Sequence, residues 1–187
     1  MSLTQAEKLQ LLQIARAALT AAVGGHPLPG LELDSLPAAL REDGASFVTL
    51  TVGGALRGCI GTLQAYQPLA LDVQTRAVEA ALEDPRFSPV LPAELPNIQI
   101  EVSRLTAPKP LEYTDPAELI RLLRPGVDGV VLRDGPHRAT FLPQVWSQLP
   151  EPTQFLDQLC YKMGSPSALW REGHPQVEIY QVEEFHE

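Results

Sequence analysis

The sequence predicts an α+β fold, with mainly antiparallel strands and flanking helices. Apolar residues recur at helical spacing in several segments, and turn-forming dipeptides join neighbouring strand patterns into hairpins. Strands and helices do not alternate in the regular order of a doubly wound parallel sheet. The length of 187 residues suits one compact domain, which we expect to span residues 1–187.

The first two helices are predicted near the N-terminus. Thr4 and Glu7 have the spacing of a capping box, and apolar residues follow at helical intervals from Leu9 to Val23. Gly24-Gly25 is expected to end this helix. After a connection rich in proline and glycine, a short helical stretch is expected near Leu36–Arg41.

A hairpin and a long helix are expected next. The pattern Ser46–Val52 predicts a strand, and Gly53-Gly54 predicts a tight turn that pairs it with Ala55–Leu63 in antiparallel fashion. The segment Leu69–Asp84 has one apolar helical face and stops before Pro85, because a residue that precedes proline disfavours helix.

The following elements are a half-exposed strand and a third helix. Apolar and polar residues alternate over Asn97–Leu105, which is the period of a strand. Asp115 has the position of an N-cap and Pro116 that of the first helical residue, so a helix is expected to about Leu123.

The C-terminal part predicts a second hairpin, a helix and a closing strand. Val127–Arg133 and His137–Leu142 flank the turn signal Asp134-Gly135. Helical spacing returns over Gln154–Met163, with Gly164 as the C-terminal cap, and Gln176–Val182 reads as a strand.

Composition and charge exclude several classes of protein. The hydrophobic share of 44% and the charged share of 20% are ordinary for a folded chain and exclude disorder or a coiled coil. The net charge of −9 argues against nonspecific binding to nucleic acid or to anionic membranes, so a cationic or neutral partner fits better. Two cysteines make no disulfide framework, and no targeting or membrane segment is evident, so we expect a cytoplasmic protein.

The segment Leu56-Arg57-Gly58-Cys59-Ile60-Gly61-Thr62 holds the first candidate site. On a regular strand Leu56 and Ile60 would point to the core, and Arg57, Cys59 and Gly61 would share the opposite face. A cation beside a thiol favours the thiolate, and Gly58 and Gly61 would let a ligand approach the backbone. The alternative is structural: a buried cysteine, with glycines that permit close packing.

A second strand adds polar residues to the candidate site. If Asn97–Leu105 joins the same sheet, Glu101 and Ser103 lie on the face of Arg57 and Cys59. The alternative is a solvated face with an Arg57–Glu101 ion pair. Arg86 is a further candidate for anion binding, or it holds the helix terminus together with Asp84.

Other kinds of site are disfavoured. The four histidines, at 26, 137, 174 and 186, lie outside these segments, so no base for a Cys–His dyad is evident. Metal-ligand spacings are absent, and the glycine spacing near Gly53 lacks the lysine of a phosphate loop, so we predict no metal and no cofactor. Cys160 is predicted to be buried and inert.

Several segments in the same order resemble the AMMECR family, named after the Alport syndrome, mental retardation, midface hypoplasia and elliptocytosis chromosomal region. They are Phe47–Leu50, Leu56–Gly61, Asp84–Phe87, Ile100–Ser103, Gly126–Val130, Phe141–Val145, and Phe155-Leu156 leading to Lys162–Gly164. Met163 departs from the usual pattern, which has an alanine there.

The resemblance implies an α+β fold of two unequal lobes, with a cleft lined by the LRGCIG motif. Prokaryotic members are called AmmeMemoRadiSam system protein A, which implies association with a Memo-like protein and a radical S-adenosylmethionine protein. The family has no settled reaction, and the residues here that match its proposed site are Arg57, Gly58, Cys59 and Gly61.

Two hypotheses about function remain open. In the first, the protein is a binding or accessory protein that holds a small molecule or a peptide segment through Arg57, Arg86 and backbone amides. In the second, it is an enzyme in which Cys59 is the nucleophile, Arg57 stabilises the thiolate or binds an anion, and Glu101 orients a proton or substrate. The first needs no histidine base, and the sequence therefore favours it.

Overall fold

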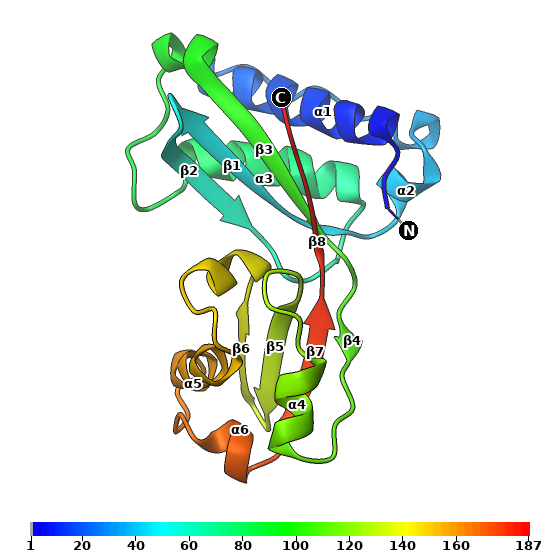
Figure 1. Cartoon of the computed structure of the whole chain (residues 1–187). Helices are drawn as coiled ribbons and strands as arrows, with labels where there is room; N and C mark the ends of the chain where they lie inside the picture. Colours follow the sequence, from blue (N-terminus) through cyan, green and yellow to red (C-terminus); the bar gives the residue numbers. More distant parts are fainter. Residues whose placement is uncertain (1) are drawn as a thin grey trace. The chain divides into compact units, whose positions relative to one another are not determined.

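The computed structural model describes residues 2–187; Met1 lies outside the described residues. The chain divides into two compact units, one formed by residues up to Leu105 together with Glu183–Glu187, and one formed by Thr106–Val182. Each unit has a four-stranded sheet and helices (Figure 1). The predicted α+β class is confirmed.

The sheet of the first unit has the strand order β2-β1-β3-β8. Its strands are β1 (Ala45–Val52), β2 (Ala55–Gly61), β3 (Ile98–Leu105) and β8 (Val182–His186). Strand β1 pairs in antiparallel fashion with β2 through the Gly53-Gly54 turn, as predicted, and with β3 on its other edge. The central position of β1 brings segments that are far apart in sequence onto one surface.

Helices α1 (Gln5–Val23) and α3 (Leu69–Leu82) pack against one face of this sheet (Figure 1). Thr4 caps α1 through the predicted capping box with Glu7. The short elements are α2 (Ala38–Arg41) and the 3-10 helices η1 (Leu33–Ser35) and η2 (Pro92–Asn97). Alternate strand residues meet the helices in the core, among them Val48, Leu50, Ile100 and Val102. The other face carries the intervening residues, and we call it the helix-free face of the first unit, defined by Phe47, Thr49, Cys59 and Glu101.

A buried carboxylate joins α3 to the sheet. Asp72 is fully buried and accepts hydrogen bonds from the backbone N–H and the hydroxyl of Ser46, at 2.8 and 2.7 Å. Gln67 and Arg76 donate to its other oxygen. Because each lone pair that leaves water finds a donor, the carboxylate is tolerated in the core.

The second unit has its own sheet, with the order β4-β7-β5-β6. Its strands are β4 (Lys109–Pro110), β5 (Gly129–Asp134), β6 (His137–Phe141) and β7 (Gln176–Tyr180). Its helices are α4 (Pro116–Leu122), α5 (Pro152–Lys162), α6 (Leu169–Glu172) and the 3-10 helix η3 (Pro143–Ser147). Asp115 caps α4 and the hairpin forms at Asp134-Gly135, both as predicted.

The core of the second unit is built on aromatic side chains. Trp146 stacks on Phe155 with 3.7 Å between ring centroids, and Trp170 is buried. Cys160 is fully buried beside them, as predicted, and burial raises the pKa of its thiol.

The closing strand differs from the prediction. The segment predicted as one strand, Gln176–Val182, contains β7 and then the start of β8, which belongs to the other sheet and continues to His186. The charged Glu183 interrupts the strand pattern in the sequence. In the structure Glu183 is half-buried, forms an ion pair with Lys8 and accepts a hydrogen bond from the backbone N–H of Leu3. No helix in residues 2–187 is long and apolar enough to span a membrane.

Candidate functional site

A β-bulge in strand β2 changes the predicted faces of the LRGCIG segment. Leu50 lies opposite Gly58 and Thr51 opposite Leu56, which leaves Arg57 as the additional residue. Past the bulge Ile60 packs on the core as expected, but Leu56 is 43% exposed. The prediction that Leu56 points to the core was therefore wrong, because the extra residue shifts the alternation.

The guanidinium of Arg57 lies on Glu94 of η2. It donates to both carboxylate oxygens, at 2.7 and 3.0 Å, and to the carbonyl oxygens of Ser88 and Pro89. These hydrogen bonds from Arg57, followed by the one from the Leu91 N–H, lower the pKa of Glu94 to about 2. Arg57 therefore forms its ion pair with Glu94 and not with Glu101, the partner that the sequence suggested. Through Glu94, Ser88 and Pro89, Arg57 anchors the loop that precedes β3.

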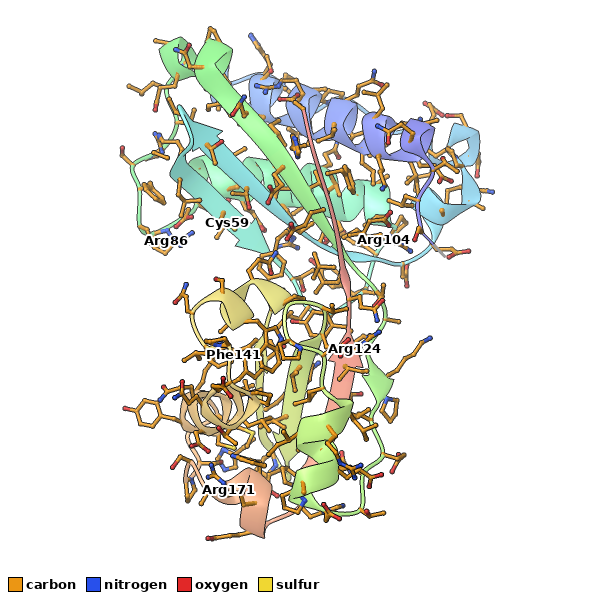
Figure 2. All side chains as sticks on the ribbon, in the orientation of Figure 1. Cys59, Arg86, Arg104, Arg124, Phe141 and Arg171 are labelled. Carbon is orange, nitrogen blue, oxygen red and sulfur yellow. The ribbon has the colours of Figure 1, made fainter. Side chains whose placement is uncertain are left out.

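Cys59, which is labelled in Figure 2, is the first member of a row of side chains that crosses the sheet. Thr49 on β1 lies opposite Cys59 on one side and opposite Glu101 on the other. The Thr49 hydroxyl donates to the Cys59 sulfur at 3.3 Å. Two strand spacings separate Cys59 from Glu101, which is about 10 Å. The structure therefore places Glu101 on the face of Cys59, as expected, with Thr49 between them.

Strand β8 extends this row on the other side of Glu101. Strands β3 and β8 run in opposite directions (Figure 1), and the backbone N–H of Glu187 donates to the carbonyl of Ile100. This register places His186 opposite Glu101. Burial, followed by the charge of Glu184, raises the pKa of Glu101, whereas His186 lowers it. The row thus presents a thiol, a hydroxyl, a carboxylate and an imidazole.

The backbone of Cys59 is held by Asp84 and Arg86. The Cys59 N–H donates to Asp84 at 2.8 Å, and Arg86 donates to the Cys59 carbonyl at 3.2 Å and to both oxygens of Asp84. Strand β2 is the outer strand of its sheet, so this pair satisfies polar groups that an edge would otherwise expose. The Arg86 guanidinium holds the pKa of Asp84 well below its usual range.

The two candidate glycines and Ser103 have packing roles in this structure. A Cβ at Gly58 would lie 2.1 Å from the carbonyl oxygen of Ala80, so the backbone of α3 occupies the approach that a ligand was expected to use. A Cβ at Gly61 would lie 2.2 Å from the Phe47 ring. Ser103 lies opposite Phe47 on β3 and is buried.

The geometry lacks the parts of an activated nucleophile. Neither Arg57 nor a histidine among residues 2–187 makes a hydrogen bond to the Cys59 sulfur; its recorded partner is Thr49. Within the described residues no group of three potential ligands could hold a metal ion. The arrangement is suited to recognition: hydrogen-bonding side chains lie in a line on the helix-free face.

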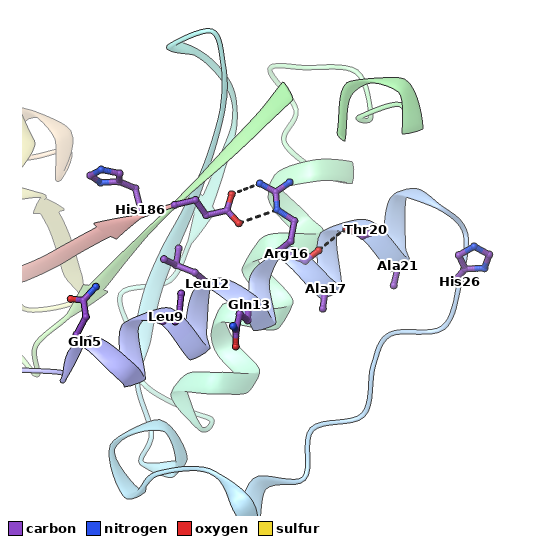
Figure 3. Close-up of a pocket in the computed structure, with 11 residues that line it drawn as sticks. Gln5, Leu9, Leu12, Gln13, Arg16, Ala17, Thr20, Ala21, His26 and His186 are labelled. Atoms are coloured by element: carbon purple, nitrogen blue, oxygen red, sulfur yellow. Dashed lines mark hydrogen bonds and ion pairs between the residues drawn. The ribbon is translucent and has the colours of Figure 1, made fainter. Parts of the chain in front are cut away.

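Two pockets lie outside the part of this row that Cys59, Thr49 and Glu101 form, and the larger shares His186 with the row. The larger, of about 670 Å³, runs along α1 and is lined by residues that include Leu9, Ala17 and His186 (Figure 3). The Arg16–Glu187 ion pair lies in its wall. The smaller, of about 350 Å³, lies in the second unit beside the Tyr113 and His174 rings. The LRGCIG residues line neither pocket.

Sequence reasoning missed three residues of the site. Thr49 and His186 join it only through strand pairing, and Glu94 through the loop that Arg57 anchors. The alternation of Ser46–Val52 could have placed Thr49 on the same face as Cys59, since both strands belong to the predicted hairpin. No local signal identifies His186.

Comparison with known proteins gives the family. A protein from Methanothermobacter thermautotrophicus is 39% identical over 186 residues, which cover 99% of this chain and 96% of that protein. One from Nanoarchaeum equitans is 32% identical over 94% of this chain and 96% of its own length. The crystal structure of an uncharacterised protein from Pyrococcus horikoshii matches with a TM-score of 0.84 and 31% identity, over 99% of this chain and 93% of that one. The family model described as AMMECR1 matches residues 12–185, and the chain belongs to that family.

Proposed function

We propose that this protein is a binding or accessory protein whose ligand lies on the helix-free face of the first unit, across Cys59, Thr49 and Glu101. The observation that carries the proposal is the row itself: three strands present polar side chains in line, without a base at the thiol. Such a surface can bind a small molecule or an extended peptide segment, because both expose donors and acceptors at strand-like intervals.

The proposed partners are a Memo-like protein and a radical S-adenosylmethionine protein, and the proposed location is the cytoplasm. The support for the partners is the family membership together with the name of its prokaryotic members. The support for the location is that both cysteines are free thiols, as is usual in a reducing compartment.

The second candidate is a cysteine-dependent enzyme with Cys59 as nucleophile. One observation favours it: Cys59 is only half-buried, whereas Cys160 is fully buried. Against it, the guanidinium of Arg57 is bound to Glu94 and donates nothing to the thiol.

Alkylation by iodoacetamide separates the two candidates. The rate at Cys59 is measured against pH by peptide mass mapping, in the native protein and in Arg57→Ala, with Cys160 as the buried internal control. Under the binding proposal the two proteins share one pH profile, because Arg57 does not contact the sulfur. A profile displaced to lower pH in the native protein relative to Arg57→Ala would favour the enzyme and overturn the binding proposal.

Co-purification tests the proposed surface. The native protein is expected to retain a Memo-like or radical S-adenosylmethionine protein encoded by the same genome, and Thr49→Arg is expected to lose it. The control is Thr20→Arg, because Thr20 is exposed on α1. Cys59→Ser is a milder change on the same face. Equal retention by Thr49→Arg and Thr20→Arg would contradict the proposal that partners bind there.

A further inference from the structure

Glu101 differs from every other carboxylate of comparable burial. Among residues 2–187, the other Asp and Glu side chains that are not exposed each have a hydrogen bond or an ion pair within the protein. They are Glu7, Asp72, Glu79, Asp84, Glu94, Glu118, Asp128, Asp157, Glu178 and Glu183. Glu101 has neither, and the groups that affect its charge are Glu184 and His186 on β8.

This difference matters because a carboxylate that is partly removed from water without a donor is unfavourable. The other carboxylates that are not exposed have donors or cations within the protein, even where the donor lies far away in sequence. Glu94 on η2, for example, receives hydrogen bonds from Arg57 on β2. Glu101 lies in the middle of a sheet, between Thr49 on β1 and His186 on β8, and neither neighbour makes a hydrogen bond or an ion pair with it. Burial without a donor is typical of a group that binds a ligand.

The neighbouring charges indicate the sign of that ligand. Burial raises the pKa of Glu101, Glu184 lies close enough to raise it further, and the opposite influence of His186 is smaller than that of Glu184. The arginines beside Cys59 are paired, Arg86 with Asp84 and Arg57 with Glu94. The charge of the row is therefore negative at its Glu101 end, in line with the net charge of the chain.

We infer that the helix-free face binds a ligand with an alkylammonium group, whose cation lies on Glu101 and whose chain runs past Thr49 towards Cys59. The inference rests on the proposed binding function and adds the ligand class to it. The ammonium supplies the donors that Glu101 lacks. The chain is about 10 Å long, the distance of two strand spacings from Glu101 to Cys59. A free amine and a lysine side chain share this chemistry.

Charged thiol reagents test the inference at the site itself. Methanethiosulfonates transfer their substituted thio group to a thiolate and release methanesulfinate, so Cys59 reports which substituent approaches it. The probes are the neutral methyl, the cationic aminoethyl and the anionic sulfonatoethyl reagents, with each rate divided by that for free cysteine. We expect the aminoethyl reagent to exceed the sulfonatoethyl reagent by about fourfold or more at low salt, since one charge at about 10 Å alters each rate about twofold in opposite senses.

Matched variants assign the preference to Glu101. Glu101→Gln, which keeps the shape of the side chain, is expected to reduce the ratio of the two rates at least threefold. Glu112→Gln removes one exposed carboxylate of the second unit and is expected to leave it unchanged. A similar loss in both variants would indicate an effect of net charge and would overturn the inference.

The length of the ligand is tested by the mixed disulfides. An aminohexyl group attached to Cys59 spans about 10 Å and reaches Glu101, whereas an aminoethyl group does not. Reduction by glutathione is therefore expected to be slower for the aminohexyl than for the neutral hexyl derivative, and Glu101→Gln is expected to abolish this difference. Equal rates in the native protein would overturn the inference.

Protection experiments separate the two sources of the ammonium group. Hexylamine and an acetylated, amidated pentapeptide with lysine at its centre are each added before the neutral reagent. Protection by both supports a free amine, and protection by the peptide alone supports a lysine side chain; protection by neither overturns the inference. If Cys59 does not react with the neutral reagent in the native protein, the proposed function fails as well. If it reacts without a preference for charge, only the inference fails.

Discussion

The two faces of the sheet in the first unit satisfy their polar groups differently. On the face covered by α1 and α3, the fully buried Asp72 receives four hydrogen bonds, from Ser46, Gln67 and Arg76. On the helix-free face, Glu101 is half-buried and receives none from residues 2–187. Saturation by the protein's own donors gives Asp72 a structural role, and the lack of donors at Glu101 is the basis on which we propose that it binds a ligand.

The polar groups at the edge of the sheet are satisfied in a third way. Strand β2 is an outer strand, and its polar groups at Cys59 are satisfied by Asp84 and Arg86 rather than by another strand. Arg57 and Glu94 secure the adjoining loop. The arginines expected to bind a ligand are thus paired with carboxylates of the protein, and we therefore place the proposed ligand at the middle of the face.

The largest expected effect is on the helix-covered face. Asp72→Ala removes the acceptor shared by three side chains and one backbone N–H, and leaves Arg76 buried with fewer partners. We expect the free energy of unfolding to fall by about 3–5 kcal/mol. Denaturant unfolding measures it, with the exposed Asp34→Ala as the control. Equal losses in the two variants would remove the distinction between the faces.

A second large effect is expected at the contact between β2 and α3. Gly58→Ala would place a Cβ 2.1 Å from the carbonyl oxygen of Ala80. Because backbone must move to relieve this overlap, we expect a loss of about 2–3 kcal/mol. A Cβ added at Gly30 would meet no atom within 4 Å, so Gly30→Ala serves as the control in thermal unfolding. If Gly58→Ala unfolds at the temperature of the native protein, the helix does not require glycine there.

A smaller effect with a defined pH dependence is expected at the edge. The pKa of Glu94 is lowered from 4.5 to about 2 by Arg57 and the Leu91 N–H. A lowered pKa in the folded state contributes stability above pH 4.5 that is lost as the pH falls towards about 2. Because the pair is partly exposed, Glu94→Gln is expected to cost about 1 kcal/mol at neutral pH and to have no effect at the acid end. A loss that is independent of pH would contradict this.

The smallest effect has the opposite sign. Burial raises the pKa of Glu101, so its ionised form costs stability at neutral pH, and this cost disappears as the pH falls below the raised pKa. Glu101→Gln is therefore expected to stabilise the protein by roughly 0.5–1 kcal/mol at neutral pH. Unfolding curves of Glu101→Gln and Glu94→Gln at several pH values measure the contrast directly. Destabilisation by Glu101→Gln would mean that Glu101 is a structural carboxylate.

The regular elements could be predicted because their signals are local. The capping box at Thr4, the Gly53-Gly54 turn and the N-cap at Asp115 each depend on residues within one turn of chain, and each forms as predicted. The prediction of one closing strand, Gln176–Val182, missed the change from β7 to β8 and the extension of β8 to His186, because Glu183 takes its partners from the N-terminal segment. The partners of such residues are distant in sequence.

The candidate site could be predicted only in part. The alternation of β3 correctly places Glu101 on the face of Cys59. The bulge at Arg57 and the use of Arg57 and Arg86 as structural ion pairs could not be read from the LRGCIG segment. A bulge arises from the register between two strands, and an ion pair from the loop that brings the carboxylate near.

The sequence by itself determined the family, the α+β class and most of the elements, because capping, turn chemistry and periodicity act over a few residues. Only the tertiary structure decided which polar side chains have hydrogen-bond partners within the protein. Asp84, Glu94 and Glu101 are similar carboxylates in the sequence, and they differ in what the folded chain brings to within hydrogen-bonding distance. The unpaired carboxylate is a property of long-range packing, and it is the feature that most directly indicates a ligand.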